Sequence, residues 1–188
     1  TTAYMPTAPL LRMRAAEPTQ RRKPGKNEAR TLTLSGITRM EGEGNERKFR
    51  LSFSSELPYE RWWGVEILDH AEGAVDLTRL NEIGVLLFNH NRDVILGKIV
   101  RAWIENSRGM AEVEFDTDDQ AEIIYQKVRS GTLKGVSVGY RIDAIEEVMA
   151  GKTSADGRFT GPCEIARKWW PYEISIVSVP ADGTVGVG

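Results

Sequence analysis

The chain has 188 residues, of which 40% are hydrophobic and 28% are charged, and its formal net charge is −2. These values are ordinary for a globular protein and provide enough apolar side chains for a buried core. No apolar run approaches the roughly 20 residues that span a bilayer, and the N-terminus lacks the apolar core of a secretory signal. We therefore expect one domain with tails and no membrane partner.

Basic residues are concentrated near the N-terminus. Residues 1–30 contain seven Lys or Arg and two Glu, which leaves a net charge of −7 for the rest of the chain. Because this segment is rich in Pro, Thr and Ala and has no helical periodicity, it predicts a disordered arm. The arm is either a solvated tail or an electrostatic tether to nucleic acid or an acidic partner. No folded nucleic-acid module accompanies it, so we expect no sequence-specific binding to nucleic acid.

Short segments that alternate apolar and polar residues, or that are continuously apolar, predict strands along most of the chain. The turn-rich segment 150–161 lies between two of them and predicts a long hairpin. The expected strands are 31–37, 47–54, 61–68, 85–90, 97–105, 109–116, 133–140, 140–148, 163–170 and 172–179.

Two helices are expected. Residues 76–83 predict a short helix opened by Asp76. The second helix has Thr117 three residues before Gln120, the spacing of a capping box, and Gly131 can end it. Its apolar stripe comprises Ala121, Ile124, Tyr125 and Val128.

Many strands and few helices predict a mixed α/β but β-dominated domain. The expected architecture is a small, mainly antiparallel β-barrel or a sandwich with peripheral helices. The expected boundaries are a basic arm at 1–30, the folded domain at 31–183 and a C-terminal tail at 184–188.

The segment LKGVSVGY (133–140) places a serine between two glycines within a predicted strand. Val136, Val138 and Tyr140 would share one bulky apolar face of that strand. The opposite face would carry Gly135, Ser137, Gly139 and Arg141. Glycine weakens a strand and often marks a close approach by a ligand or another backbone. We therefore expect a ligand or another segment of backbone to approach Ser137.

A serine hydroxyl needs a base within hydrogen-bonding distance to act as a nucleophile, and histidine is the usual base near neutral pH. The chain has two histidines, His70 and His90. His90 follows a buried apolar run, where a strand ends and a side chain can face a cleft, whereas His70 lies in a polar, turn-prone context. We expect His90 to be the base, with an ordinary surface or packing histidine as the alternative.

A third, acidic group would hold the imidazole in one tautomer and stabilise its charged form. Glu173 is our candidate because it lies in a strand that is otherwise dense in apolar residues, where a carboxylate needs a partner or a role. The alternatives are that Glu173 faces water on an edge strand, or that Asp69 or Asp116 fills this position.

Competing chemistries lack their motifs. The G-x-S-x-G letters of GVSVG (135–139) lie within a predicted strand and not in the strand–turn–helix elbow of α/β-hydrolases, and the sequence has no phosphate-binding loop and no HExxH. Cys163 is the single cysteine, so it predicts no internal disulfide or zinc site, and we interpret it as a packing or loop residue. A metal-dependent hydrolase would have to combine His70 and His90 with distant carboxylates, and it stays a remote alternative. We expect no cofactor.

Three segments together resemble the prohead proteases of tailed bacteriophages. They are LLFNHNRDVILGKI (86–99), SGTLKGVSVGYRI (130–142) and WWPYEISIVSVPAD (169–182), and the resemblance covers about residues 31–183. The order and the spacing also agree, since His90 comes 47 residues before Ser137 and Glu173 follows 36 residues later.

The resemblance implies a serine endopeptidase with a herpesvirus-assemblin-like fold. By analogy with the family, His90 in the NH motif is the base, Ser137 is the nucleophile, and Glu173 is the matching acid. Family members often have Asp directly after the histidine, whereas this chain has Asn91, with Asp93 two residues further on. This difference removes an acid from the adjacent position and leaves the Ser–His dyad intact.

The resemblance also implies a location and partners. Such proteases act inside the immature procapsid, in the bacterial host cytoplasm, on scaffold protein or the scaffolding segment of the major capsid protein, and commonly on themselves. The basic arm would then be a targeting or removable extension. Assemblin-like proteases often need dimerisation, so a homo-oligomer is expected by analogy, and the tryptophan pairs 62–63 and 169–170 are interpreted as core or interface residues.

The expected reaction is acyl transfer, with the oxyanion stabilised by backbone N–H groups near Ser137 or by the Arg141 guanidinium. A solvent-facing charge is the alternative role for Arg141. The alternative function is a non-catalytic β-barrel component of a capsid or tube, in which the two glycines serve only for close backbone packing.

Overall fold

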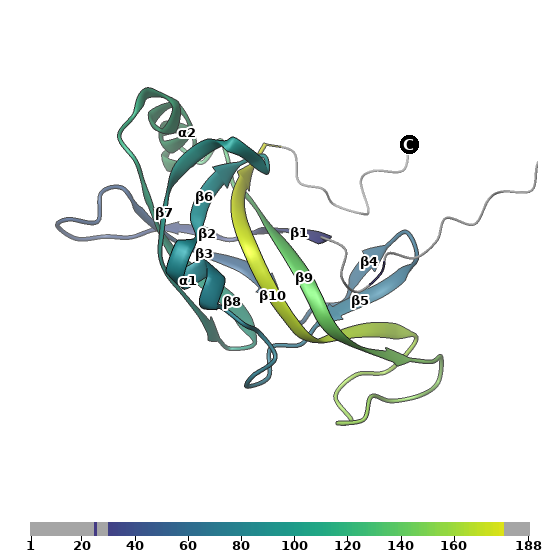
Figure 1. Ribbon diagram of the computed structural model, residues 1–188. Helices are drawn as coiled ribbons and strands as arrows, with labels where there is room; N and C mark the ends of the chain where they lie inside the picture. Colours follow the sequence, from purple (N-terminus) through teal and green to yellow (C-terminus); the bar gives the residue numbers. More distant parts are fainter. Residues whose placement is uncertain (1–24, 26–29, 179–188) are drawn as a thin grey trace, which may run out of the picture.

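The computed structural model describes Gly25 and residues 30–178 (Figure 1). The predicted arm, except Gly25 and Arg30, and the predicted tail lie outside the described residues. No helix within the described part of the chain is long and apolar enough to cross a membrane. The elements are β1 (Arg30–Ser35), β2 (Ile37–Arg39), β3 (Lys48–Ser55), β4 (Tyr59–Arg61), β5 (Gly64–Leu68), α1 (Thr78–Ile83), β6 (Val85–Phe88), β7 (Asn91–Glu105), β8 (Arg108–Phe115), α2 (Asp119–Arg129), β9 (Gly135–Val148) and β10 (Cys163–Val177).

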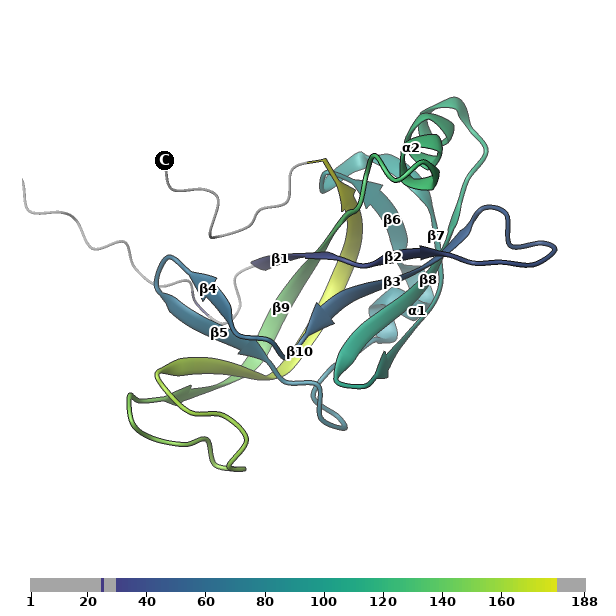
Figure 2. The same cartoon turned by 180° about the vertical axis from the view of Figure 1, so that it is seen from behind.

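The strands form one curled sheet, in the order β1-β9-β10-β6-β7-β8-β3-β2. Its two end strands, β1 and β2, are separated in the chain by Gly36 alone, so the sheet curls round on itself into a barrel-like form (Figures 1 and 2). Most pairs are antiparallel, and β10 alone pairs in parallel, with β5 and with β6. The expected β-dominated, mainly antiparallel fold with few helices is confirmed.

The expected strand at 61–68 is confirmed only from Gly64 onward, because its first part is a hairpin turn. β4 ends at Arg61 and β5 begins at Gly64, with the two strands antiparallel. Gly64 has φ +145, a conformation that residues with a Cβ rarely adopt, so the glycine fixes where the second strand can begin. Trp62 in the turn is 58% exposed, whereas Trp169 of the other pair is fully buried in the core.

The two helices lie at the expected places, but both of the expected N-terminal caps are wrong. α2 begins after Asp118, whose carboxylate accepts a hydrogen bond from the Ala121 amide at 3.3 Å, so this aspartate caps the helix in place of Thr117. Asp76 accepts a bond from the Thr78 amide at 3.0 Å, and the cap position of α1 is Leu77. The expected apolar stripe of α2 is buried: Ala121, Ile124, Tyr125 and Val128.

The apolar face of β9 packs in the main core, as its alternation predicted. Val136, Val138, Tyr140 and Ile142 are fully buried among side chains of β3, β7, β8 and β10. The Tyr140 ring lies edge-to-face against Trp169, with the ring centres 5.6 Å apart. Because this face is occupied by the core, the opposite face of β9, with Ser137, points away from it.

A network of buried charges lies where β1, β5 and β9 meet β10. The Glu66 carboxylate accepts hydrogen bonds from the Arg30 guanidinium and from the Tyr140 hydroxyl. Arg61 adds bonds to Glu66 at 3.1 Å and to the Tyr140 oxygen at 2.5 Å, and Arg30 also lies 3.6 Å from Glu164. Burial beside Glu66 raises the pKa of Tyr140 well above its usual value, so this residue stays a neutral donor.

Removing Glu66 should be far more damaging than removing a surface carboxylate. We expect Glu66→Ala to lower the free energy of unfolding by about 3–5 kcal/mol, because the guanidinium groups of Arg30 and Arg61 would each lose a buried counter-charge. The matched control is Glu114→Ala, since Glu114 pairs with Lys98 at 3.6 Å on the exposed side of the sheet, and its loss should cost less than about 1 kcal/mol. Urea unfolding measures both, and equal losses would contradict the expectation.

Candidate functional site: a Ser–His–Glu arrangement at the end of β6

The tight turn between β6 and β7 positions His90. Asn89 and His90 have φ values of 50° and 58°, so both central residues of this two-residue hairpin are left-handed, as a type I′ turn requires. Asparagine and histidine both adopt this conformation more often than most residues other than glycine, and Asn106 and Ser107 adopt it in the turn between β7 and β8. The turn is attached to β10, because the Asn89 amide donates to the Ile176 carbonyl at 2.9 Å and its side chain accepts from the Ser178 amide at 3.0 Å.

Three of the predicted site residues meet on the outer face of the sheet. His90 Nε2 lies 2.8 Å from Ser137 Oγ, and His90 Nδ1 is hydrogen-bonded to Glu173 Oε1. Since a carboxylate only accepts, Nδ1 carries the proton and Nε2 is free to accept the serine proton. These are the relative positions of a Ser–His–acid triad.

The carboxylate is buried in the middle of the sheet, and the edge-strand alternative for Glu173 is therefore wrong. β10 is hydrogen-bonded to β9 on one side and to β6 on the other. Glu173 is 8% exposed, whereas the His90 side chain is 32% exposed and closes the outer side of the site. Ser137 is 1% exposed beneath it.

Sequence reasoning missed Ser175, which connects the parts of the site. Its Oγ accepts a hydrogen bond from the His90 amide at 3.1 Å and donates one to Glu173 Oε2 at 3.0 Å. It also lies directly opposite Ser137 in the β9–β10 ladder. Strand alternation places Glu173 and Ser175 on one face, and this pattern was the signal that could have identified it.

The packing around position 139 explains why one of the two residues that flank the Val–Ser–Val segment is a glycine. A Cβ at this position would lie 2.7 Å from the Tyr172 ring and 2.8 Å from Glu173 Oε1. Contacts this short do not occur, so a Cβ at position 139 would displace the Tyr172 ring and the Glu173 carboxylate that is hydrogen-bonded to His90. The sequence pattern predicted a close approach at this glycine, and the approaching groups are the side chains of Glu173 and Tyr172.

The other candidate residues lie elsewhere. Asp69 is paired with Arg158 at 2.6 Å and with Arg167 at 3.0 Å. Burial alone would raise its pKa, but the hydrogen bond from the Ala71 amide and the bonds from the two arginines outweigh burial and lower it. Asp116 follows the last residue of β8, and neither aspartate has a hydrogen bond to His90. Arg141 lies four residues beyond Ser137 on β9, about 13 Å along the strand, and its role at the oxyanion stays a prediction.

His70 differs from the expectation of a polar, turn-like setting. It is 5% exposed directly after β5, where Nδ1 donates to the Leu68 carbonyl at 2.8 Å and Nε2 accepts from Ser54 Oγ at 2.7 Å. Burial lowers its pKa, which is the expected result for an imidazole packed edge-to-face against Trp169. Both nitrogens of this ring form hydrogen bonds within the protein.

Residues 30–178 contain no group of three or more His, Cys, Asp or Glu side chains that could hold a metal ion.

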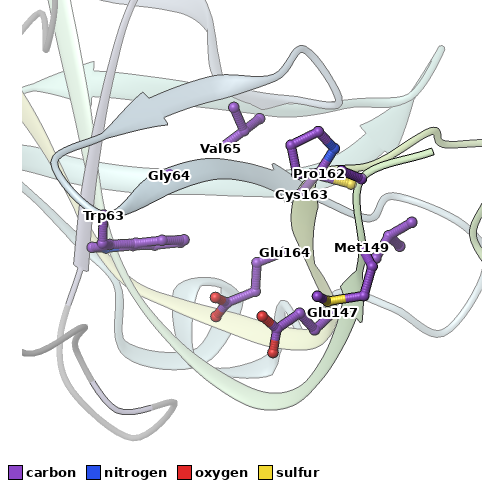
Figure 3. A pocket seen from close by; sticks show the side chains of 10 residues that line it. Trp63, Gly64, Val65, Glu147, Met149, Pro162, Cys163 and Glu164 are labelled. Atoms are coloured by element: carbon purple, nitrogen blue, oxygen red, sulfur yellow. The ribbon is translucent and has the colours of Figure 1, made fainter. Parts of the chain in front are cut away.

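A separate pocket of about 310 Å³ lies at the far end of the β9–β10 ribbon (Figure 3). Trp63, Glu147, Met149, Cys163 and Glu164 contribute to its walls, and the two carboxylates lie near one another. Glu147 is ten residues from Ser137 along β9, about 33 Å for an extended strand. This pocket is therefore not part of the Ser–His–Glu arrangement.

The hydrogen bonds among Ser137, His90 and Glu173 indicate the class of this site. A serine, a histidine and a carboxylate in hydrogen-bonded series on a β-barrel-like scaffold are the arrangement of a serine hydrolase. Residues 67–187 match the family model described as caudovirus prohead serine protease. The chain belongs to this family, as its resemblance predicted.

Two individual proteins are similar. The major capsid protein of Halomonas phage phiHAP-1 is 38% identical over 142 residues, which cover 73% of this chain and 22% of that protein. Among solved structures, the bacteriophage T4 capsid assembly protease, gp21, matches with a TM-score of 0.44 and 11% identity, over 82% of this chain and all of that one.

Adding a methyl group at position 139 should disable the site while the fold survives. We expect Gly139→Ala to displace Glu173 and to slow the reaction of Ser137 with a fluorophosphonate by about 10²-fold, the scale that a 1 Å misplacement causes. The control is Gly36→Ala, because a Cβ there would meet only Ser52 Cβ at an ordinary 3.7 Å. Labelling of Gly139→Ala at the wild-type rate would contradict this account of the glycine.

The buried His70 should make stability depend on pH. Because burial lowers its pKa in the folded chain, the unfolded chain binds the proton more tightly, so stability is lost as the pH falls below about 6.5. One such group contributes at most about 1.4 kcal/mol per pH unit. We expect urea unfolding between pH 7.5 and 5.5 to show a steeper loss for the wild type than for His70→Gln. Parallel curves would exclude this role for His70.

Proposed function

We propose that this chain is a serine endopeptidase and that Ser137, His90 and Glu173 are its catalytic triad. The observation that carries the proposal is the 2.8 Å contact between His90 Nε2 and Ser137 Oγ, with Nδ1 of the same ring hydrogen-bonded to Glu173. Membership of a family of prohead serine proteases supports the same chemistry.

The proposed reaction is acyl transfer to Ser137. His90 Nε2 takes the hydroxyl proton as Oγ attacks the carbonyl carbon of a peptide bond. The tetrahedral intermediate collapses, the C–N bond breaks, and His90 returns the proton to the leaving amine, which leaves an acyl-enzyme. A water molecule then attacks the ester in the same way and releases the acid. Glu173 holds the ring in the required tautomer and stabilises the imidazolium that forms at each step.

The oxyanion needs donors within about 3 Å of the reacting carbonyl oxygen. Arg141 is about 13 Å from Ser137 along the strand, and β9 around Ser137 is paired with β1 on one side and β10 on the other. We therefore propose backbone N–H groups outside the β9 ladders as the oxyanion donors, and we assign Arg141 no step in the reaction.

The proposed substrates are the capsid protein and the scaffold protein of a tailed phage, cut inside the procapsid, together with the chain itself. The family name and the similarity to a major capsid protein support this choice. Residues 31–183 would form the protease domain and the basic arm a removable extension. A homo-oligomer is part of the same proposal.

The second candidate is a non-catalytic segment of a capsid protein. It is favoured by the similarity to a protein named as a major capsid protein, of which this chain spans 22%. In that case Ser137, His90 and Glu173 would form only a buried polar network. The two candidates differ in one chemical property, the reactivity of the Ser137 hydroxyl.

A serine-directed probe separates the two candidates. The full chain is treated with a fluorophosphonate, and the modified residue is identified by peptide mass spectrometry. We expect labelling at Ser137, and we expect Ser137→Ala and His90→Ala to reduce cleavage of coexpressed capsid protein by more than about 10⁴-fold. Thr153→Ala, an exposed hydroxyl at the far hairpin, is the control and should behave as wild type.

Circular dichroism of each variant confirms that the fold is retained. Absence of labelling at Ser137, or equal labelling in His90→Ala, would refute the catalytic assignment and favour the structural candidate.

A further inference from the structure

Three arginines from different elements gather beside the proposed triad. Arg79 comes from α1, Arg92 from the start of β7 and Arg141 from β9, and all three side chains are exposed. With Trp170 and Tyr172 of β10 they line a surface hollow of about 260 Å³, which we call the arginine groove. No step of the proposed reaction uses the arginine groove.

The arginine groove continues to the triad. A second hollow of similar size shares Arg79, Arg92 and Tyr172 with it and reaches Glu173, the acid of the site. Ile83, Val85 and Leu87 also line this second hollow. A polypeptide that lies across the site and follows the hollow would therefore meet both apolar side chains and the arginines.

Two arginines of the groove, Arg79 and Arg92, differ from most other arginines of the described residues in their lack of ion pairs. Seven other arginines of the described chain form ion pairs with carboxylates: Arg30, Arg47, Arg50, Arg61, Arg101, Arg158 and Arg167. Neither Arg79 nor Arg92 has such a pair with any carboxylate among residues 30–178. The acid that borders the hollow, Glu173, already uses one oxygen for His90 and the other for Ser175.

The distance along the strand limits what the groove can bind. Arg141 is four residues from Ser137 on β9, about 13 Å, and an extended polypeptide covers this distance in about four residues. Arginine side chains are long, so a group two to four residues from the scissile bond is within their reach. A carboxylate is the group that guanidinium donors bind best in a peptide, often through two parallel hydrogen bonds.

We propose that the arginine groove is a substrate subsite, which binds an Asp or Glu side chain located two to four residues from the peptide bond that is cut. The proposal rests on the proposed protease function. Because the arginines are exposed, each contributes modestly and salt weakens the contact, so the groove selects among peptides more than it anchors them.

The test uses the full chain and a library of peptides made by digesting a bacterial proteome. Mass spectrometry of the products gives the residues around every new cut. We expect acidic residues to be enriched two to four positions from the cut, on one side of it. The double variant Arg79→Gln, Arg92→Gln should lose this enrichment and should cleave acidic peptides about 3- to 10-fold more slowly, while it cleaves neutral peptides as before.

The matched control is Arg39→Gln, which removes an exposed arginine of β2 outside the groove. It should keep the wild-type cleavage profile. Raising the salt concentration from 50 to 500 mM should reduce the preference of the wild type and leave that of the double variant unchanged.

The outcomes separate the subsite from the protease function. If Ser137 is labelled and the wild type cuts the library without acidic enrichment, or if the double variant keeps the enrichment, the subsite is refuted and the protease function stands. If Ser137 is not labelled at all, the protease function fails and the subsite fails with it. A fluorescent single-stranded oligonucleotide that binds the wild type and not the double variant would reassign the groove to nucleic acid.

Discussion

Strand β10 is hydrogen-bonded to β9 on one side and to β6 on the other, and the candidate site depends on this double pairing. The first pairing sets Ser175 opposite Ser137 and Glu173 opposite Gly139. The second brings the turn after β6 over the same part of β10, where the His90 amide bonds to Ser175. A shift of one residue in either ladder would turn the serine or the carboxylate to the other face of the sheet.

The site is built from features that would weaken an ordinary sheet. It includes a histidine in the left-handed region, a glycine within a strand and a carboxylate in the buried centre. Each has a local cost, and each is offset by a specific neighbour: β10 holds the turn, the Glu173 side chain fills the space above Gly139, and hydrogen bonds from His90 and Ser175 satisfy both carboxylate oxygens. Features that break local rules together at one place are typical of functional sites.

The two histidines show how position decides chemistry. Each ring has a serine hydroxyl at one nitrogen, at 2.7 Å for His70 and 2.8 Å for His90. The other nitrogen of His70 bonds to a backbone carbonyl inside the core, whereas that of His90 bonds to a carboxylate beside open solvent. A serine and a histidine in contact are therefore insufficient for a site, which also needs the acid and the partial exposure.

The sequence alone determined the β-dominated class, most strands and the apolar faces of β9 and α2, and it predicted the three residues of the candidate site. Alternation and helical periodicity are local properties, and the resemblance to a family supplied the pairing of distant motifs. The hairpin at Trp62–Trp63, the cap at Asp118, the burial of His70 and the role of Ser175 were decided by tertiary structure. The arginine groove belongs with them, since its residues come from four elements that meet only when β10 joins β9 and β6. The physical reason is the same in each case. These features depend on which elements are neighbours in the fold, and the local periodicity of the sequence does not predict the order of strands in a sheet.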